Sequence, residues 1–180
     1  KYDLTEHYIL NVGSIEERKN VLLAVKALPH LPQEMHLVIV GRRTPYTDEV
    51  ETFIRIHHLE DRVKILSGVP FIDLPAIYQQ AEIFVYPSRF EGFGIPIIEA
   101  IHSGLPVVAA TGSCLEESGG PDSIYVHPDD VEAMVAALKR ITCDESLRQN
   151  MLEQGKKYVC RFSEEKQVQQ LVCIYNNKWC

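Results

Sequence analysis

Short apolar runs alternate with amphipathic stretches through the first two thirds of the chain. Runs rich in Val, Ile, Leu and aromatic residues predict buried strands at residues 8–12, 35–40, 62–66, 82–86, 106–110 and 123–126. Between them, apolar positions spaced three and four apart predict helices that begin near Asn20, Thr47, Asp73 and Pro96. This alternation indicates an α/β fold with a doubly wound, mostly parallel sheet and right-handed crossovers.

Residues that favour helix ends refine these boundaries. Asn20 and Asp73 are candidate N-caps, Pro29 is expected to end the first helix, and Gly104 is a candidate C′ residue. After the sixth predicted strand the apolar spacing is helical throughout, which predicts C-terminal helices at 129–141, 144–158 and 163–177. No repeat, low-complexity tract or Pro/Gly linker divides the sequence, so we expect residues 1–180 to form a single domain.

Composition narrows the function classes. A hydrophobic content of 46% is enough for a sizeable core, and a formal charge of −7 disfavours binding of nucleic acid or acidic membranes by the whole surface. No segment has the roughly 18 to 20 uninterrupted apolar residues of a spanning helix. The N-terminal residues lack the basic and apolar regions of a signal peptide. We therefore expect a cytoplasmic location, with peripheral membrane association at most.

Cysteines and histidines give no sign of a metal site. The five cysteines and seven histidines show no metal-ligand spacing, so no metal is expected. The odd number of cysteines and their irregular spacing favour reduced thiols in a reducing compartment.

A glycine loop between the fourth predicted strand and a helix carries the main chemical signal. Pro96 stands at a first-turn position, which suits a helix start. The backbone amides before it, from Gly92, Phe93, Gly94 and Ile95, would present free N–H groups and the positive end of the helix dipole. In parallel α/β sheets ligands bind at this edge. The loop is thus a candidate site for an anion such as a diphosphate.

Two carboxylates flank the same loop. Glu91 precedes the glycines and Glu99 lies about one turn inside the helix. Beside a phosphate site they would face neutral hydroxyls, because an ionised carboxylate accepts strong hydrogen bonds from vicinal hydroxyl groups. Glu91 is a candidate for a hexose and Glu99 for a ribose, as in a sugar nucleotide. The alternative is that Glu91 is a solvated loop residue and that Glu99 is a first-turn acid stabilised by the helix dipole.

The turn after the first predicted strand is a second candidate. It runs from Gly13 and Ser14 to Asn20 and lacks both the dinucleotide-binding glycine spacing and the P-loop glycine and lysine. A Rossmann dehydrogenase or nucleoside triphosphatase is therefore disfavoured. Its cations, Arg18 and Lys19, are candidates for contact with a diphosphate; otherwise they form a solvated helix start.

Five blocks of the sequence together resemble the C-terminal, donor-binding domain of glycosyltransferase family 4, whose members are retaining enzymes of the GT-B fold. The hallmark of the family is Glu, seven residues, Glu, and here it runs from Glu91 to Glu99 and continues into Gly104-Leu-Pro-Val-Val108. The other similar blocks, in the same order as in the family, are Val12-Gly-Ser-Ile-Glu-Glu-Arg-Lys-Asn20, Leu37-Val-Ile-Val-Gly41, Asp73-Leu-Pro-Ala-Ile-Tyr78 and Tyr125-Val-His-Pro-Asp-Asp130. The resemblance covers nearly the whole chain.

The resemblance implies roles for individual residues. Lys19 occupies the position of the lysine that reaches the donor diphosphate, while the usual arginine just after Gly13 is replaced by Ser14, so that Arg18 is its possible substitute. Glu91 would orient the sugar and stabilise positive charge at the anomeric carbon. Val69 would meet the nucleotide base through its backbone. No cofactor is implied beyond the sugar-nucleotide donor substrate, and no metal.

The resemblance also implies partners. The complete enzyme would bind a glycan or lipid-linked acceptor between this domain and an N-terminal domain absent from the chain, on which the helix at 163–177 would pack. The run Arg18-Lys19-Asn20, which follows a small residue at Ser14, is similar to that of several mannosyltransferases and favours mannose as the transferred hexose. Two other classes remain open: a GT-B isomerase or phosphorylase, and a noncatalytic nucleotide-sugar-binding domain.

Overall fold

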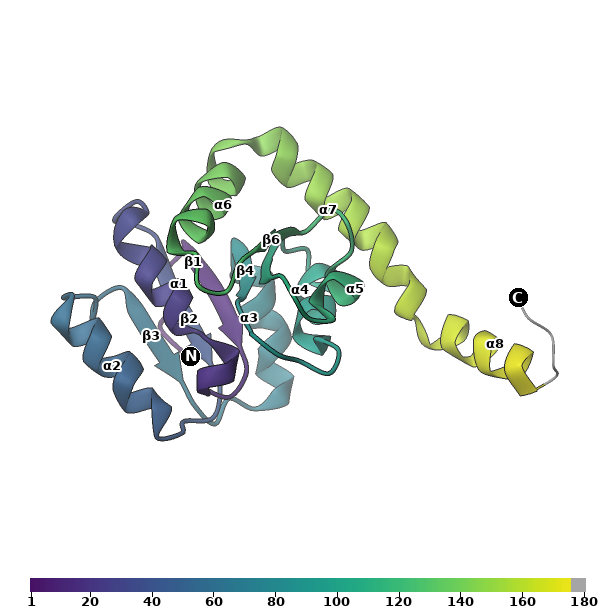
Figure 1. The fold of residues 1–180 in the computed structure, drawn as a ribbon, viewed down its shortest axis with the longest axis horizontal. Helices are drawn as coiled ribbons and strands as arrows, with labels where there is room; N and C mark the ends of the chain where they lie inside the picture. The colour runs from purple at the N-terminus through teal and green to yellow at the C-terminus, as the bar shows by residue number, and fades with distance from the viewer. Residues whose placement is uncertain (176–180) are drawn as a thin grey trace.

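The computed structural model, which describes residues 1–175, is built on one six-stranded parallel sheet (Figure 1). The strand order is β3-β2-β1-β4-β5-β6, and every neighbouring pair is parallel. The strands are β1 (Tyr8–Val12), β2 (His36–Val40), β3 (Val63–Leu66), β4 (Ile83–Tyr86), β5 (Val107–Ala110) and β6 (Ile124–Val126). The expected doubly wound α/β fold is confirmed, with each strand within one residue of its predicted limits.

Helices cover both faces of this sheet. On one face α1 (Leu22–Ala27), α2 (Tyr46–Ile56) and α6 (Val131–Cys143) contribute to one hydrophobic core. On the other, α3 (Leu74–Gln80), α4 (Ile95–His102) and α5 (Leu115–Gly119) contribute to a second. The strands supply both cores in alternation, since Ile9 belongs to the first and its neighbours Tyr8 and Leu10 to the second. Burial on both faces explains why the central strands β4 and β5 read as continuous apolar runs.

Two of the predicted helix ends are correct. The first helix changes to a 3-10 turn, Leu28–His30, at Pro29. Gly104 has φ of +82° and follows α4 as its C′ residue. Its N–H donates to the Ile101 carbonyl, and that of Leu105 donates to the Ala100 carbonyl. These two bonds form a Schellman motif, which satisfies carbonyls at the end of α4.

Of the two predicted N-caps, Asn20 is wrong, since Val21 precedes α1, and Asp73 holds the N-cap position of α3 without capping it; both side chains are engaged elsewhere. Asn20 adopts a left-handed conformation after a short 3-10 helix, Glu17–Lys19, and its amide donates to the Pro87 and Pro128 carbonyls. Asp73 ends another 3-10 helix, Phe71–Asp73, and its carboxylate accepts from Lys1 and Tyr2 rather than from an amide of α3.

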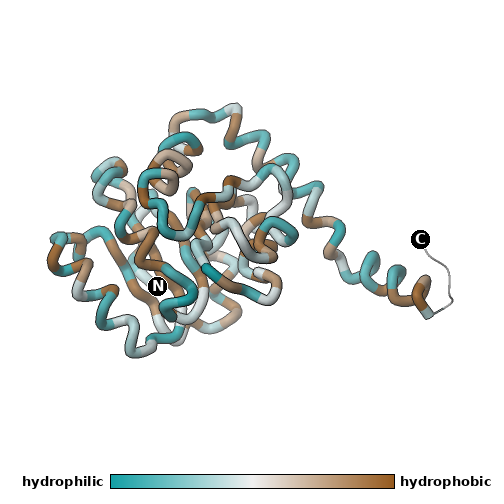
Figure 2. Tube along the Cα trace, in the orientation of Figure 1, coloured by the Kyte–Doolittle hydropathy of each residue, from teal (hydrophilic) through white to brown (hydrophobic). Residues whose placement is uncertain are grey.

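The C-terminal helices leave the sheet progressively. Asp130 and Asp144 cap α6 and α7 (Glu145–Val159) through their side chains. A 3-10 turn, Cys160–Phe162, leads into α8 (Glu164–Tyr175), which extends away from the α/β body (Figure 1). The predicted residues 176 and 177 of this helix lie outside the described residues. Apolar side chains of α8 are exposed, and its distal end is marked as hydrophobic in Figure 2: Val168, Leu171, Val172, Ile174 and Tyr175.

Two further observations bear on the expectations from composition. Cys114, Cys143 and Cys160 are free thiols, whereas Cys173 is disulfide-bonded, so the expectation of reduced cysteines is wrong for Cys173. Among the described helices, none combines the length and apolar character needed to cross a bilayer.

Candidate functional site

The two loops singled out in the sequence meet at the point where the strand order reverses. β1 lies between β2 and β4, so the chain leaves β1 towards one side of the sheet and leaves β4 towards the other. A crevice forms outside the carboxyl ends of two such strands. Backbone bonds join the loops there, because the Arg89 N–H donates to the Arg18 carbonyl at 2.8 Å. The Asn20 amide adds a second link, to the Pro87 carbonyl at 3.1 Å.

Glu91 is the centre of a polar cluster built from both loops. Its Oε1 accepts from the Ser88 hydroxyl at 2.9 Å and from the Tyr86 hydroxyl at 3.0 Å. The Lys19 ammonium lies 3.2 Å from the same oxygen, and Arg18 Nη1 lies 3.4 Å away. Within residues 1–175 no hydrogen bond or ion pair engages the other oxygen, Oε2. One oxygen therefore fixes the side chain while the second can accept from a ligand.

The surroundings of Glu91 keep it ionised. Burial, which leaves 12% of its side chain exposed, raises its pKa. The Ser88 hydrogen bond and the nearby Lys19 charge outweigh burial, so the net pKa lies below its usual value. At neutral pH the carboxylate is charged and accepts hydrogen bonds.

Lys19 is held between two strand ends. Its ammonium donates to the Tyr86 hydroxyl at 2.9 Å and contacts Glu91, and 15% of its side chain is exposed. An ammonium has three N–H donors, so one remains for an anion. Gly13 makes room for this side chain, because a Cβ there would lie 3.1 Å from Lys19 Nζ.

Ser14 and Arg18 are linked through Glu16. The Ser14 hydroxyl donates to one oxygen of Glu16 at 2.5 Å, and Arg18 Nε lies 2.9 Å from the other. Arg18 Nη1 also donates to the Phe90 carbonyl at 3.2 Å, although 47% of its side chain is exposed. Arg18 thus points towards the Glu91 loop, whereas Ser14 is connected to Arg18 only through Glu16.

The glycine loop presents unpaired amides. Among the described residues, the N–H groups of Gly92, Phe93, Gly94 and Ile95 donate to no protein acceptor, and no side chain caps α4. Gly94 has φ of +98°, and a Cβ there would lie 2.7 Å from the Ser118 hydroxyl, so the turn requires glycine. The Phe93 ring packs edge to face on Phe162, with 5.4 Å between centroids. The loop is anchored, and its donors are available to an anion.

Glu99 lies apart from this cluster and faces α3. The Tyr78 hydroxyl donates to Glu99 Oε2 at 2.9 Å. The carboxylate borders a largely apolar hollow between α3 and α4, with Phe71, Leu74 and Ile98 in its lining. Glu91 and Glu99 therefore lie in different surroundings, each with a buried tyrosine as its partner.

Val69 borders a separate hollow at the carboxyl ends of β2 and β3. Gly41, Arg42 and Arg43 line it together with Ser67 and Gly68. The loops after β1 and β2 approach very closely here, because a Cβ on Gly41 would overlap the Gly13 carbonyl oxygen at 1.8 Å. This contact requires glycine at position 41 and joins the Val69 hollow to the Gly13 loop.

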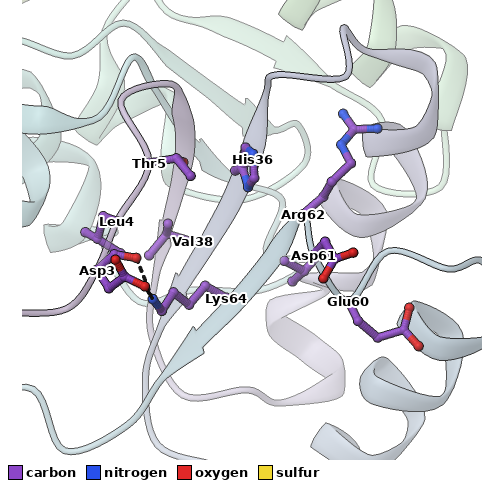
Figure 3. A pocket seen from close by; sticks show the side chains of 10 residues that line it. Asp3, Leu4, Thr5, His36, Val38, Glu60, Asp61, Arg62 and Lys64 are labelled. Carbon is purple, nitrogen blue, oxygen red and sulfur yellow. Dashed lines mark hydrogen bonds and ion pairs between the residues drawn. The ribbon is translucent and has the colours of Figure 1, made fainter.

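A charged pocket at the opposite edge of the sheet is unrelated to these loops. It lies at the amino ends of β2 and β3, where His36, Arg62 and Lys64 are in its lining (Figure 3). Lys64 reaches Asp3, and the Arg62 guanidinium is bound to the Pro32 and Met35 carbonyls. Its cations are thus already engaged by the protein. Over residues 1–175, no group of three His, Cys, Asp or Glu side chains is arranged to hold a metal ion.

Residues 2–158 match the family described as glycosyl transferases group 1. The chain belongs to this family. It is 34% identical to O-antigen chain mannosyltransferase B of Escherichia coli over 97% of its own length and 47% of that protein. The chain thus spans about half the length of this curated relative.

Solved structures agree on the fold. Sucrose-phosphate synthase from Thermosynechococcus elongatus superposes with a TM-score of 0.86 at 28% identity, over 96% of this chain and 45% of that one. Anabaena Alr3699/HepE, solved in complex with UDP and glucose, has a TM-score of 0.86 at 21% identity, over 96% of this chain and 49% of that one. The sheet and its flanking helices match the Rossmann-like domain of GT-B glycosyltransferases.

Two polar residues that bind the glutamates escaped the sequence analysis. They are Tyr78 and Tyr86, whose hydroxyls donate to Glu99 and Glu91. For Tyr86 there was a signal, since it is a hydroxyl-bearing residue that ends an apolar strand at the sheet edge where ligands bind. Tyr78 gave none, because it is buried in a helix like any core aromatic residue.

Proposed function

We propose that this chain is the C-terminal, donor-binding half of a retaining family 4 glycosyltransferase. It would move a hexose, with a lean towards mannose, from a nucleoside-diphosphate sugar to a glycan or lipid-linked acceptor. The observation that carries the proposal is the Glu91 cluster: a carboxylate fixed through Oε1 and open at Oε2, beside Lys19 and the unpaired amides of the glycine loop. This combination suits a sugar joined to a diphosphate.

The donor would lie along the carboxyl edge of the sheet. The base would meet the backbone at Val69, the ribose hydroxyls would bind Glu99, and the diphosphate would lie over the amides of residues 92–95. The sugar would then reach Glu91. The separate surroundings of the two glutamates support this order, since Glu99 faces α3 and Glu91 faces the Gly13 loop.

The reaction breaks the bond between the anomeric carbon and a phosphate oxygen. The electron pair leaves with the diphosphate, whose growing negative charge the loop amides, Lys19 and Arg18 would stabilise. Preorganised donors of this kind are often the largest contribution to catalysis. Glu91 would orient the sugar and stabilise positive charge at the anomeric carbon. The acceptor hydroxyl would attack from the face that the diphosphate leaves and pass its proton to the departing phosphate oxygen, which retains the configuration without a protein nucleophile. These groups supply the positive charge without a metal.

The remaining half of the enzyme would be an N-terminal domain that binds the acceptor. The chain's share of its curated relative, 47%, leaves room for such a domain. The exposed apolar side chains of α8 would pack on it. The relative's name, an O-antigen chain mannosyltransferase, supports both mannose and a polysaccharide acceptor. We place the activity in the cytoplasm, at the membrane surface where the acceptor is lipid-linked.

Calorimetric titration of two variants tests the assignment. Glu99→Ala is expected to weaken binding of a nucleoside diphosphate and of the matching sugar nucleotide alike, because both contain the ribose. Glu91→Ala is expected to weaken the sugar nucleotide and to leave the nucleoside diphosphate nearly unchanged. The ligands are GDP with GDP-mannose, and UDP with UDP-glucose. Equal losses for both ligands in both variants would contradict the assigned roles.

A further inference from the structure

Tyr86 is buried beneath the Glu91 cluster and ends there in a single polar atom. It is the last residue of β4, and 2% of its surface is exposed. Its ring stacks on Phe84 from the same strand, with 5.8 Å between centroids and 18° between planes. The ring is fixed by packing, so the position of its hydroxyl is also fixed.

The direction of both hydrogen bonds at this hydroxyl follows from chemistry. A tyrosine hydroxyl has one proton to donate and lone pairs to accept with, whereas an ammonium can only donate and an ionised carboxylate can only accept. The hydroxyl therefore accepts from Lys19 at 2.9 Å and donates to Glu91 at 3.0 Å. Burial, followed by the nearby Glu91 charge, raises the pKa of Tyr86, so the hydroxyl keeps its proton at neutral pH.

We propose that Tyr86 is a positioning residue, which holds the Lys19 ammonium and the Glu91 carboxylate in one arrangement before the donor binds. This inference rests on the proposed function, in which Lys19 binds the diphosphate and Glu91 binds the sugar. The two groups are 3.2 Å apart and attract each other. A rigid hydroxyl between them fixes where each one lies, so that less ordering remains when the donor arrives.

Removing the hydroxyl separates positioning from packing. Tyr86→Phe keeps the ring on Phe84 and deletes both hydrogen bonds. Lys19 and Glu91 then keep their contact with each other, and Glu91 keeps its contacts with Ser88 and Arg18. We expect Tyr86→Phe to weaken sugar-nucleotide binding about 3- to 30-fold, which is less than the roughly 10- to 150-fold of a direct hydrogen bond to a charged group, because Tyr86 acts on the ligand through Lys19 and Glu91.

Tyr8→Phe is the matched control. Tyr8 is fully buried in the same core, and its hydroxyl donates to the Ile77 carbonyl at 2.6 Å, away from the cluster. Tyr8→Phe removes the same hydroxyl group as Tyr86→Phe, so we expect a comparable effect on stability. The measurement is calorimetric titration of both variants and of the unmodified chain with GDP, GDP-mannose, UDP and UDP-glucose, after thermal unfolding has been recorded for each. Tyr8→Phe should bind like the unmodified chain.

The pH dependence of binding gives a readout that a packing role would not move. The charged or titratable groups that face Glu91 are Arg18, Lys19 and Tyr86, with Cys114 bound to its backbone carbonyl. Loss of one donor to the carboxylate raises the pKa of Glu91. The acid limit of sugar-nucleotide binding should therefore move to higher pH, by about 0.5 to 1 unit, in Tyr86→Phe and not in Tyr8→Phe.

A double variant makes the test sharper. If Tyr86 acts through Lys19, Tyr86→Phe should cost little further nucleoside diphosphate affinity in a Lys19→Met background. Unchanged affinity and an unchanged acid limit in Tyr86→Phe would overturn the inference, as would a chain that no longer folds, since the hydroxyl would then serve stability. Failure of the proposed function looks different, because the unmodified chain itself would bind none of the four ligands.

Discussion

At the scale of single residues, Lys19 should contribute to donor binding through charge. We expect Lys19→Ala to weaken nucleoside diphosphate binding about 10- to 100-fold, the range for a charged hydrogen-bond donor. The loss should be smaller at high salt, because ions screen the attraction. Titration of GDP and UDP at about 50 mM and 500 mM salt, where the screening length falls several-fold, measures both effects.

Arg18→Ala is the companion variant. Arg18 is far more exposed than Lys19 and is already paired with Glu16, so its removal should cost less affinity. Guanosine and uridine serve as controls without phosphate, and neither variant should change their binding. Unchanged diphosphate binding in Lys19→Ala, with binding abolished in Arg18→Ala, would show that the wrong cation has been chosen.

The residues that sequence predicts best are those whose chemistry is local. Glu91, Glu99 and the loop glycines belong to one short segment, so their relation to a helix start is visible without coordinates. Tyr86 and Lys19 lie 67 positions apart along the chain, and only the parallel pairing of β1 with β4 brings them together. Contacts made through the sheet order are therefore the part of the site that the sequence could not supply.

At the scale of elements, the start of α4 is set by two glycines with different tasks. A Cβ on Gly94 would meet Ser118 and Leu115 within 3 Å, at a φ of +98°. Gly92 has open space around it and no left-handed φ. We expect Gly94→Ala to lower the free energy of unfolding by about 2 to 4 kcal/mol, whereas Gly92→Ala should change it by less than about 1 kcal/mol.

Diphosphate binding is expected to be weakened by Gly92→Ala, the variant that leaves stability nearly unchanged. If a diphosphate approaches the loop closely, a methyl group on Gly92 would obstruct it even though the fold tolerates the change. Urea unfolding gives the stabilities, and titration with GDP or UDP gives the affinities. Gly92→Ala with native stability and undiminished diphosphate binding would contradict the placement of the anion over this loop.

The elements themselves were predicted closely, and the exceptions have a common cause. A strand buried on both faces gives a continuous apolar run, so its limits can be predicted from the sequence to within one residue. Asn20 and Asp73 carry side chains suited to capping, but neither caps a helix, although Asp73 holds the N-cap position of α3. Their side chains bind distant partners instead: the Pro87 and Pro128 carbonyls for Asn20, and Lys1 and Tyr2 for Asp73. Local preference does not reveal a competing partner that is distant in sequence.

A pH-dependent ion pair between His7 and Glu82 joins the amino ends of β1 and β4. His7 Nδ1 is bound to Glu82, and that hydrogen bond, followed by the Glu82 charge, raises the pKa of His7 above its ordinary 6.5. The protonated form is favoured in the fold, so its stabilisation is fully present below pH 6.5 and is lost as pH rises through the folded pKa. We expect His7→Gln to be less stable than the unmodified chain at pH 5.5, with the difference narrowing by pH 9. Urea unfolding across this range measures it, and a constant difference would contradict the ion pair.

At the scale of the whole molecule, α8 departs from the rules that govern the rest. The other described α-helices bury side chains in the two cores, whereas α8 buries none and exposes apolar residues to solvent. An exposed apolar helix face commonly marks an interaction surface. In the proposed enzyme the N-terminal domain packs on this face of α8. Hydrogen exchange at α8 should therefore slow markedly when that domain is present in the same protein.

The same arrangement decides where activity resides. All residues proposed to hold the donor belong to this chain, so it should bind a sugar nucleotide by itself. The acceptor should be positioned by the other half, and positioning contributes much of the rate of a two-substrate reaction. We therefore expect the 180-residue chain to bind donor without transferring sugar, and the two-domain protein to do both. Leu171→Ser, on the exposed face of α8, should reduce transfer by the two-domain protein and leave donor binding by this chain unchanged. Sustained acceptor-dependent transfer by this chain alone would overturn the division of labour.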